Sequence, residues 1–201
     1  MPDPNTAKPT ALVSRTTAAV LGDLRAIDGA LYAAVATTPT PALDRALRRL
    51  SRAADHSKIS LAVAAALALA PGRPRRAALA GAGSVALASA AANVLGKRVV
   101  RRKRPDREQA RMVVDRQVPM PKSASFPSGH TASATAFATA VGVVLPPAAA
   151  PLAGLAVGVG YSRVHTGVHY PGDVAAGAVL GFAAAAATLA IVHGPLRRLT
   201  G

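Results

Sequence analysis

Long stretches without a fixed charge constrain the fold of this chain more than any other feature. No Asp, Glu, Lys or Arg occurs at residues 123–162, a run of 40 positions. Further uncharged runs cover residues 77–96 (20 positions) and 174–192 (19 positions). A helix needs about 20 mostly apolar residues to cross a bilayer, and a charge inside the hydrocarbon costs several kcal/mol. These runs therefore predict membrane-spanning helices.

Proline divides the longest uncharged run into two helices, because a proline cannot continue the interior of a helix. The dividing segment is LPPAAAP at residues 145–151. A fourth run, residues 59–72, has only 14 positions, so whether residues 59–70 form a full span stays open. Aromatic residues make up 3% of the chain and nothing alternates with a period of two, so no strand is expected. The prediction is an all-α, integral-membrane helical bundle with about five to six helices in its core.

The N-terminal part of the chain differs from the apolar remainder. Residues 1–14 contain three prolines and are expected to form a disordered tail, followed by a single membrane-embedded domain at residues 15–201. Residues 15–36 show weak helical periodicity, and residues 42–54 place three leucines opposite four arginines. One or two N-terminal amphipathic helices are therefore predicted, either on an anionic membrane surface or covering other helices.

The net charge of +15 leaves two classes of partner open. A basic protein attracts nucleic acids, and it also attracts anionic membrane surfaces. In this chain the charges are confined to a few segments between uncharged runs, which favours the bilayer and argues against a nucleic-acid partner. The chain has no cysteine, which excludes disulfides and thiolate metal sites within it.

Three polar motifs stand at the ends of the predicted spans. The first, residues 97–105, follows one span, and the second, residues 127–130, precedes the next. The third, residues 162–173, lies between the last two spans. Because consecutive spans cross the membrane in alternate directions, all of these boundaries should fall on one face of the bilayer. Connectivity alone is expected to bring the motifs together.

The cations of these motifs suit a phosphate ligand. Lys97, Arg104 and Arg163 supply three positive charges, and arginine binds phosphoryl oxygens in a bidentate manner. Arg104 follows Lys97 by seven residues, so both are predicted on one face of a helix that turns outward at Pro105. The neighbouring cations are expected to form an interfacial cluster outside the site: Arg98, Arg101, Arg102, Lys103 and Arg107.

The second motif reads Pro-Ser-Gly-His and is typical of a helix start. Ser128 is the predicted N-cap, and Gly129 lets a ligand approach the backbone. Free N–H groups and the helix dipole make such a terminus an anion site. His130 would face this site and can donate a proton to a leaving oxygen. An ordinary capping turn with an incidental histidine is the alternative.

A histidine and a carboxylate four residues apart mark the third motif. Asp173 can orient one ring nitrogen of His169 and leave the other free as a nucleophile. Two histidines and an aspartate can also bind a metal, but the surrounding cations would repel it. His165 has no evident partner and is expected at the rim or in a structural role. Three further polar residues are expected to have no catalytic part: His56, His193 and, as an interhelical hydrogen-bond partner, Asn93.

The three motifs together resemble the signature motifs of the type 2 phosphatidic acid phosphatase superfamily: Lys97-x6-Arg104-Pro105, Pro127-Ser128-Gly129-His130 and Ser162-Arg163-x5-His169-x3-Asp173. That superfamily also contains vanadium haloperoxidases and bacterial acid phosphatases. The motifs occur in the family's order and cover residues 97–173. The resemblance implies metal-independent hydrolysis of a phosphomonoester or pyrophosphate on a membrane lipid, through a phosphohistidine and without a cofactor.

The resemblance also implies a role for each matched residue. His169 attacks phosphorus, Asp173 orients His169, and His130 protonates the leaving oxygen. Five residues hold the phosphate: Lys97, Arg104, Ser128, Gly129 and Arg163.

Several lipid phosphates suit a small bacterial member of this family. The candidates are a polyprenyl phosphate or pyrophosphate, a polyprenyl-phosphoryl-phosphoribose, phosphatidylglycerophosphate and phosphatidate. The basic run before Arg104 resembles that of actinobacterial enzymes acting on the phosphoribose lipid. A vanadate-dependent haloperoxidase and a non-enzymatic basic membrane-surface protein are the alternatives. Haloperoxidases are soluble, so the uncharged runs argue against the first.

The side of the membrane that carries the motifs stays open. The resemblance implies a protein of the bacterial plasma membrane with its site at the extracytoplasmic face. The positive-inside rule points to the cytoplasm, because eight Lys and Arg residues lie near the span ends on the motif face and five lie opposite. Without the three phosphate-binding cations the count is five on each side.

Overall fold

A computed structural model describes the backbone of residues 9–98 and 100–198 and the side chains of residues 18–94 and 100–192. Within these residues all regular structure is helical, as predicted. The seven α-helices are α1 (Pro9–Thr37), α2 (Pro41–Ala53), α3 (Lys58–Ala68), α4 (Arg73–Arg98), α5 (Gly129–Val144), α6 (Ala149–His165) and α7 (Pro171–Arg198). Three short 3-10 turns are η1 (Asp55–Ser57), η2 (Val114–Arg116) and η3 (Pro146–Ala148).

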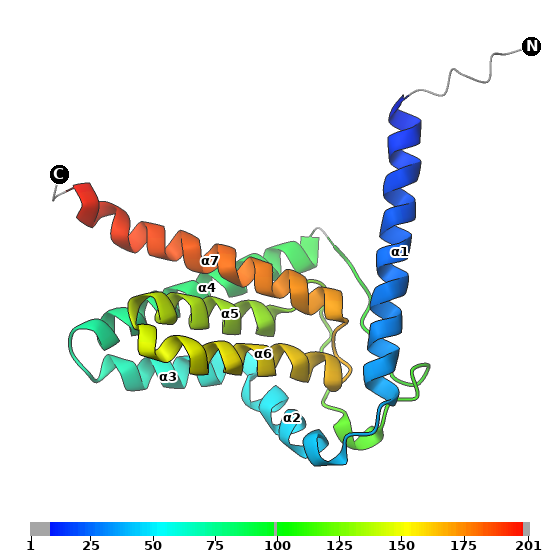
Figure 1. Cartoon of the computed structure of the whole chain (residues 1–201), viewed down its shortest axis with the longest axis horizontal. Coiled ribbons are helices and arrows are strands. Elements are labelled where there is room, and N and C mark those ends of the chain that lie inside the picture. Colours follow the sequence, from blue (N-terminus) through cyan, green and yellow to red (C-terminus); the bar gives the residue numbers. More distant parts are fainter. Residues whose placement is uncertain (1–8, 99, 199–201) are drawn as a thin grey trace, which may run out of the picture.

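Helices α3 to α7 form the bundle, which confirms a core of five helices. Helix α5 packs against α4, α6 and α7, and α3 packs against α4. Helices α1 and α2 lie outside the bundle at one of its ends (Figure 1). Helix α2 carries its arginines outward and packs against α6 through the buried side chains of Asp44 and Ser51. The helix that was predicted to be basic and amphipathic therefore covers a neighbouring helix.

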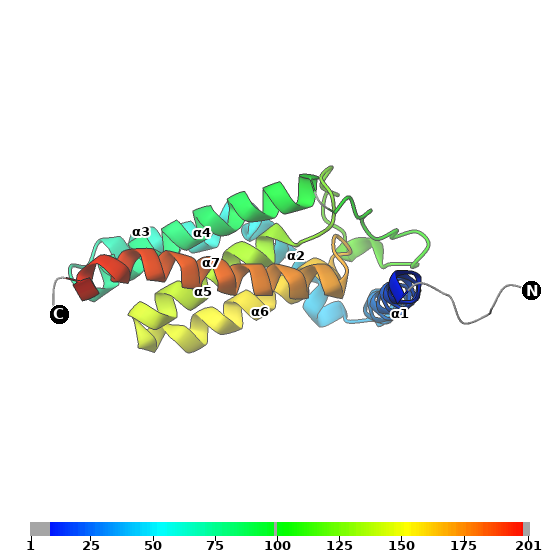
Figure 2. The same cartoon turned by 90° about the horizontal axis from the view of Figure 1, so that it is seen from above.

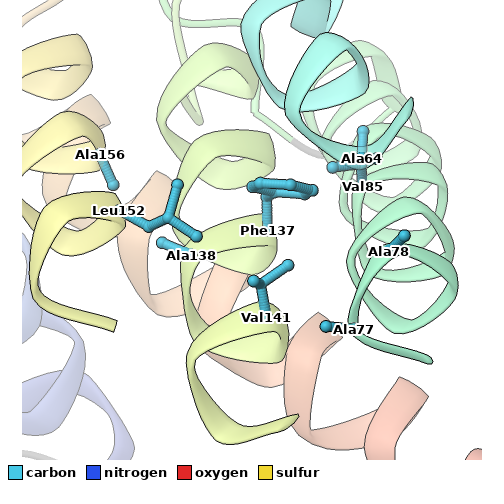
Figure 3. Close-up of a cluster of buried hydrophobic side chains, with 9 residues drawn as sticks. All are labelled: Ala64, Ala77, Ala78, Val85, Phe137, Ala138, Val141, Leu152 and Ala156. Atoms are coloured by element: carbon cyan, nitrogen blue, oxygen red, sulfur yellow. The ribbon is translucent and has the colours of Figure 1, made fainter. Parts of the chain in front are cut away.

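Small side chains let the core helices approach closely. Alanines of α4, α5 and α7 are fully buried where these helices meet, among them Ala88, Ala132 and Ala185. One larger cluster lies between α3, α4, α5 and α6, where Phe137 and Val141 of α5 point toward Ala77 and Val85 of α4 (Figure 3). The alanine-rich composition is thus used for close helix packing.

Helix lengths separate two groups within the bundle. Helices α4 and α7 are long and apolar enough to cross a membrane, over Arg73–Val94 and Pro171–Val192. Helices α3, α5 and α6 have 11, 16 and 17 residues. At 1.5 Å per residue, α3 spans only about 16 Å, roughly half of the hydrocarbon thickness. The segment left undecided by the sequence is therefore not a full span.

The motif-bearing helix ends meet at one end of the bundle, as the alternation of spans predicted. Helices α4 and α6 end there, α5 and α7 begin there, and α1 lies across the same end (Figures 1 and 2). The prolines of residues 145–151 separate α5 from α6 as expected, with η3 between them. Of the expected tail, residues 9–14 are helical and belong to α1; residues 1–8 lie outside the described part.

Candidate active site

The imidazole of His169 and the carboxylate of Asp173 lie side by side at the start of α7. His169 Nδ1 is 3.5 Å from Asp173 Oδ2, and both side chains are buried. The hydroxyl of Ser125 donates to the same Oδ2 and lies 3.4 Å from His169 Nδ1. The backbone N–H of Tyr170 donates to Oδ2 at 2.9 Å. Nδ1 therefore faces the carboxylate, and Nε2 is left to face the pocket.

Arg104 lies beside Nε2 of His169, the ring nitrogen that points away from Asp173. Its Nη1 is 3.3 Å from His169 Nε2 and donates to the carbonyl oxygen of Val168 at 2.7 Å. The other nitrogens of the guanidinium donate to Ser123 and Ala124. Arginine can only donate, so the Nε2 that faces it is the unprotonated nitrogen of a neutral imidazole. This tautomer leaves a lone pair on Nε2, as a nucleophile requires.

Burial sets the protonation state of the same histidine. It lowers the pKa of His169 below the ordinary value of 6.5, while the hydrogen bond with Asp173 acts in the opposite direction. Arg104 also lowers this pKa through its positive charge. The imidazole is therefore neutral at pH 7, in agreement with the tautomer inferred from Arg104.

His130 stands at the start of α5 and contacts an acid that the sequence analysis had not selected. Its Nε2 is 2.9 Å from Asp55 Oδ1. Asp55 belongs to η1, the short turn that joins α2 to α3, and its side chain is 41% exposed. Burial and the charge of Arg163 lower the pKa of His130 to about 4, while Asp55 acts in the opposite direction. A phosphate dianion in the pocket would add negative charge beside the imidazole and, together with Asp55, favour the protonated form that can donate a proton.

Arg163 is buried beneath His130 and Asp55. Its Nη1 donates to the carbonyl oxygen and the hydroxyl of Ser51, at 3.0 and 2.8 Å, and lies 3.6 Å from Asp55 Oδ1. Its Nε has no hydrogen-bond partner. A buried guanidinium nitrogen without a partner is costly, so this N–H is free to bind an acceptor, but Arg163 itself does not line the pocket that contains His130.

The helix start at α5 has the predicted form. Ser128 is its N-cap, and the Ser128 hydroxyl accepts hydrogen bonds from the backbone N–H and the hydroxyl of Thr131. The Ser128 side chain is fully buried by these bonds, whereas Gly129 lines the pocket. Lys97 belongs to the last turn of α4, and its side chain lies outside the described residues.

These groups surround a pocket of about 380 Å³ at the end of the bundle. The histidines of the second and third motifs, His130 and His169, line it together with Arg104, Gly129 and Ser123. A phosphoryl group placed here would meet one imidazole on each side, a guanidinium, and the N-terminus of a helix. That set of groups can bind a phosphate, attack it and protonate its leaving group.

Two expectations about the basic segment were wrong. Helix α4 ends at Arg98, so Arg104 lies in the following loop and not on a helix face shared with Lys97.

The second wrong expectation concerns Arg102 and Arg107, which do not belong to an exposed interfacial cluster. Arg107 donates to the carbonyl oxygens of three residues of the loops that carry the motifs: Thr166, Gly167 and Val118. Arg102 bonds to Asp173 itself, at 3.0 Å from Oδ1. Arg101 and Lys103 are exposed as expected, and the side chain of Arg98 lies outside the described residues.

Other polar residues also differ from expectation. His165 has a partner: its Nε2 is 3.0 Å from Asp44 Oδ1, and both are buried where α2 packs on α6. His56 lines the pocket, although the sequence placed it away from the site. Asn93 bonds the carbonyl oxygen of Ser89 in its own helix and also lines the pocket. The side chain of His193 lies outside the described residues.

Comparisons with known proteins agree with this arrangement. The family model of the PAP2 superfamily matches residues 77–196. The decaprenylphosphoryl-5-phosphoribose phosphatase of Mycobacterium tuberculosis is 41% identical over 147 residues, which cover 70% of this chain and 76% of that protein. The protein of the same name from Mycolicibacterium smegmatis is 42% identical over 134 residues, covering 65% and 68%.

Two solved structures share the fold. The transmembrane PAP2 type phosphatidylglycerolphosphate phosphatase of Bacillus subtilis superimposes with a TM-score of 0.68 and 22% identity, covering 86% of this chain and 87% of that one. Aquifex aeolicus LpxE superimposes with a TM-score of 0.62 and 25% identity, covering 79% and 92%. The helical bundle is thus a fold that a transmembrane phosphatase also has.

Proposed function

The chain belongs to the PAP2 superfamily, and on this premise we propose that it removes the terminal phosphate from a polyprenyl-phosphoryl-phosphoribose. It is a membrane protein and a lipid phosphate phosphatase. The choice of substrate rests on the mycobacterial relatives, which act on decaprenylphosphoryl-5-phosphoribose by name and are about two-fifths identical to this chain. Residues 15–201 would act as one membrane-embedded catalytic domain.

The proposed reaction has two steps. In the first, Nε2 of His169 attacks phosphorus, the bond from phosphorus to the ribose oxygen breaks, and His130 gives its proton to that oxygen. In the second, water gives a proton to His130 and attacks the phosphohistidine, which releases inorganic phosphate and restores His169. Asp173 orients His169 throughout. Five residues would hold the phosphoryl group: Lys97, Arg104, Ser128, Gly129 and Arg163.

One observation carries this mechanism. The guanidinium of Arg104 and the nucleophilic nitrogen of His169 are 3.3 Å apart and face the same pocket as His130. A single phosphate in this pocket could therefore contact the cation and the nucleophile together.

A second basic pocket supports a substrate with two phosphate groups. It has a volume of about 520 Å³, is lined by the cations Arg101, Arg102, Lys103 and Lys122, and shares Arg104 and Ser123 with the catalytic pocket. In a polyprenyl-phosphoryl-phosphoribose a phosphodiester lies on the other side of the ribose from the terminal phosphate. With the terminal phosphate beside His169, the phosphodiester would lie near these cations. Phosphatidate has no second phosphate to place there.

Phosphate release by the purified protein in detergent tests the proposal. The substrates are decaprenylphosphoryl-5-phosphoribose, decaprenyl pyrophosphate, phosphatidylglycerophosphate and phosphatidate, each assayed with EDTA present. We expect the highest kcat/KM for the phosphoribose lipid and no turnover by His169→Ala. The double variant Lys103→Ala/Lys122→Ala should raise KM for the phosphoribose lipid and leave KM for phosphatidate unchanged. A preference for phosphatidate would contradict the choice of substrate.

We also propose, from the family resemblance, that the site lies at the extracytoplasmic face. The charge count opposes this placement, because α2 adds exposed arginines to the site end of the bundle. Several cations of that end, among them Arg102, Arg107 and Arg116, are held in ion pairs or hydrogen bonds of the fold. These cations are therefore placed by contacts within the fold, so counting them in the positive-inside rule says little about which face of the membrane carries the site.

A further inference from the structure

Helix α1 reaches the catalytic centre through one buried carboxylate. The helix lies across the end of the bundle and stands apart from it over most of its length (Figures 1 and 2). Its apolar side chains are largely exposed, for example Leu24 at 55% and Ile27 at 57%. Asp28, on the same helix, is only 8% exposed. A buried charge on an otherwise exposed helix requires partners.

Both oxygens of Asp28 are occupied by groups at the start of α7 and in the loop before α5. Oδ1 accepts the backbone N–H of Gly172 at 2.6 Å, and Oδ2 lies 2.6 Å from Arg102 Nη2. A Cβ atom at position 172 would lie 2.9 Å from Oδ2, so a larger residue there would push the Asp28 carboxylate from its present position. Tyr32, one helical turn further along α1, stacks edge to face on Tyr170 with ring centroids 5.4 Å apart. Helix α1 is therefore fitted to the segment that carries His169 and Asp173.

Arg102 links Asp28 of α1 to Asp173 of the catalytic pair. While Nη2 holds Asp28, Nη1 donates to Asp173 Oδ1 at 3.0 Å. The guanidinium also lies 4.1 Å from the centroid of the Tyr170 ring. Three contacts thus fix one planar group between α1 and the first turn of α7.

The two oxygens of Asp173 consequently have separate partners. Oδ1 forms the ion pair with Arg102. Oδ2 accepts the hydrogen bond from Ser125 and lies beside His169. The carboxylate is fully buried, and among the described residues Arg102 is the one Lys or Arg that forms an ion pair with it. Without Arg102, Oδ1 would lose this partner, and more of the negative charge of the carboxylate would act on His169.

From these contacts we infer that Arg102 is a positioning residue for the His169–Asp173 pair and that Asp28 of α1 fixes Arg102 in place. The inference rests on the catalytic roles proposed above for His169 and Asp173. Arg102 makes no contact with the transferred phosphate in this scheme and acts on the reaction through Asp173, although it also lines the second basic pocket. The docked position of α1 is then a condition for turnover, although Asp28 lies outside the segment matched by the family model.

Steady-state kinetics of Arg102→Ala in detergent test the inference, with Arg111→Ala as the matched control. Arg111 is an exposed arginine of the same loop. We expect Arg102→Ala to lower kcat by about 10- to 100-fold, the loss usual for an outer partner that orients a functional histidine. KM for the phosphoribose lipid should rise as well, because Arg102 also lines the second basic pocket. Arg102→Lys keeps the charge and should recover part of the loss. Arg111→Ala should match the wild type.

The pH profile separates positioning from a purely structural role. His169 faces Asp173 from α7, Arg104 from the loop, and Arg163 and His130 from α6 and α5. Losing Arg102 removes one positive charge from Asp173, so the remaining negative charge favours the imidazolium of His169 more strongly. The acid limb of the kcat profile should therefore move to higher pH in Arg102→Ala. A variant with a lower kcat and an unshifted profile would show a structural effect only and would overturn the inference.

A double-mutant cycle tests the part played by α1. If Asp28 acts through Arg102, then Asp28→Asn lowers kcat, and adding it to Arg102→Ala causes no further loss. Losses that multiply would mean that Asp28 acts by another route. Retention of the detergent size-exclusion profile and of the helical circular dichroism by each variant shows that it is folded.

His169→Ala distinguishes failure of this inference from failure of the proposed function. If His169→Ala is inactive and Arg102→Ala keeps kcat within about twofold of the wild type, the positioning role alone is wrong. If His169→Ala retains most of its activity, the catalytic assignment itself is wrong.

Discussion

The acidic side chains at the site end show how single residues organise a strongly basic protein. The chain has 24 Lys and Arg but only nine Asp and Glu. Asp28, Asp44, Asp55 and Asp173 each contact an arginine, a histidine or both. Acidic residues are scarce in this chain, and buried cations need acidic partners. Each acidic residue could therefore have been considered a candidate site residue from the sequence.

Asp55 is predicted to support His130 as the acid of the first step. The Asp55→Asn variant keeps the shape of the side chain and removes the charge that stabilises a protonated His130. We expect kcat to fall by about 10²-fold, near the lower end of the contribution of general acid catalysis. KM should stay level or decrease, because the variant removes a negative charge beside the phosphate pocket. Steady-state phosphate release measures both, and a raised KM with an unchanged kcat would contradict the prediction.

His169 is predicted to titrate below its ordinary pKa. Burial lowers the pKa of the imidazole and Asp173 raises it, with burial the larger effect. The midpoint should therefore lie below 6.5, and Asp173→Asn should move it still lower because the opposing carboxylate is lost. Ring-nitrogen NMR of protein with labelled histidine, assigned with His169→Ala, measures the midpoint directly. A midpoint at or above 6.5 in the wild type would refute the assignment of a neutral nucleophile.

At the scale of elements, the uncharged runs predicted which helices form and where they end. The helix break at residues 145–151, the N-cap at Ser128 and the meeting of four helix ends follow from proline chemistry, capping and alternation of spans. The loop of residues 100–128 could not be predicted in this way. Its course depends on long-range bonds such as Arg104 to Val168 and Arg107 to Thr166, which leave no periodic pattern in the sequence.

The same limit applies to the site. His130, His169, Asp173 and Arg104 could be selected because their types and spacing match a chemical task. Arg102 could not, because its role depends on Asp28, 74 positions earlier in the chain. An argument from neighbouring residues alone assigns such an arginine to the solvent-exposed basic segment around it.

Close contact between α5 and α7 is predicted to depend on Gly181. A Cβ atom there would lie 2.5 Å from the carbonyl oxygen of Ala132 and 2.8 Å from Thr135 Cβ. Gly181→Ala should therefore destabilise the protein by about 1–3 kcal/mol, since backbone must move to admit the methyl group. Gly154→Ala in α6, where nothing lies within 4 Å, is the control and should be neutral or slightly stabilising. Thermal unfolding in detergent compares the two, and equal melting temperatures would contradict the close contact.

For the whole molecule, the bundle axis relates the pocket to the membrane. The pocket lies at the end where α4 and α6 finish, and the turn between α3 and α4 lies at the opposite end (Figure 1). Lipid headgroups reside at the ends of spanning helices, so this placement brings a lipid phosphate to the pocket while its tail stays in the bilayer. Helix α1 lies across the same end of the bundle (Figures 1 and 2).

The orientation of the bundle can be measured because the chain has no native cysteine. Glu108→Cys places a thiol on the exposed loop at the site end, and Leu69→Cys places one at the opposite end, where the side chain is 88% exposed. With the site outside, a membrane-impermeant maleimide should label Glu108→Cys in intact cells and Leu69→Cys only after permeabilisation. The reverse pattern would place the site in the cytoplasm.

The account depends above all on His169 acting as the nucleophile, and the covalent intermediate tests this directly. Purified protein is mixed with lipid substrate carrying ³²P in its terminal phosphate, quenched within milliseconds in alkali, and digested for mass spectrometry. We expect an acid-labile, alkali-stable phosphate on His169 of the wild type, and none in His169→Ala. Turnover with the label on another residue, or continued turnover by His169→Ala, would contradict the mechanism.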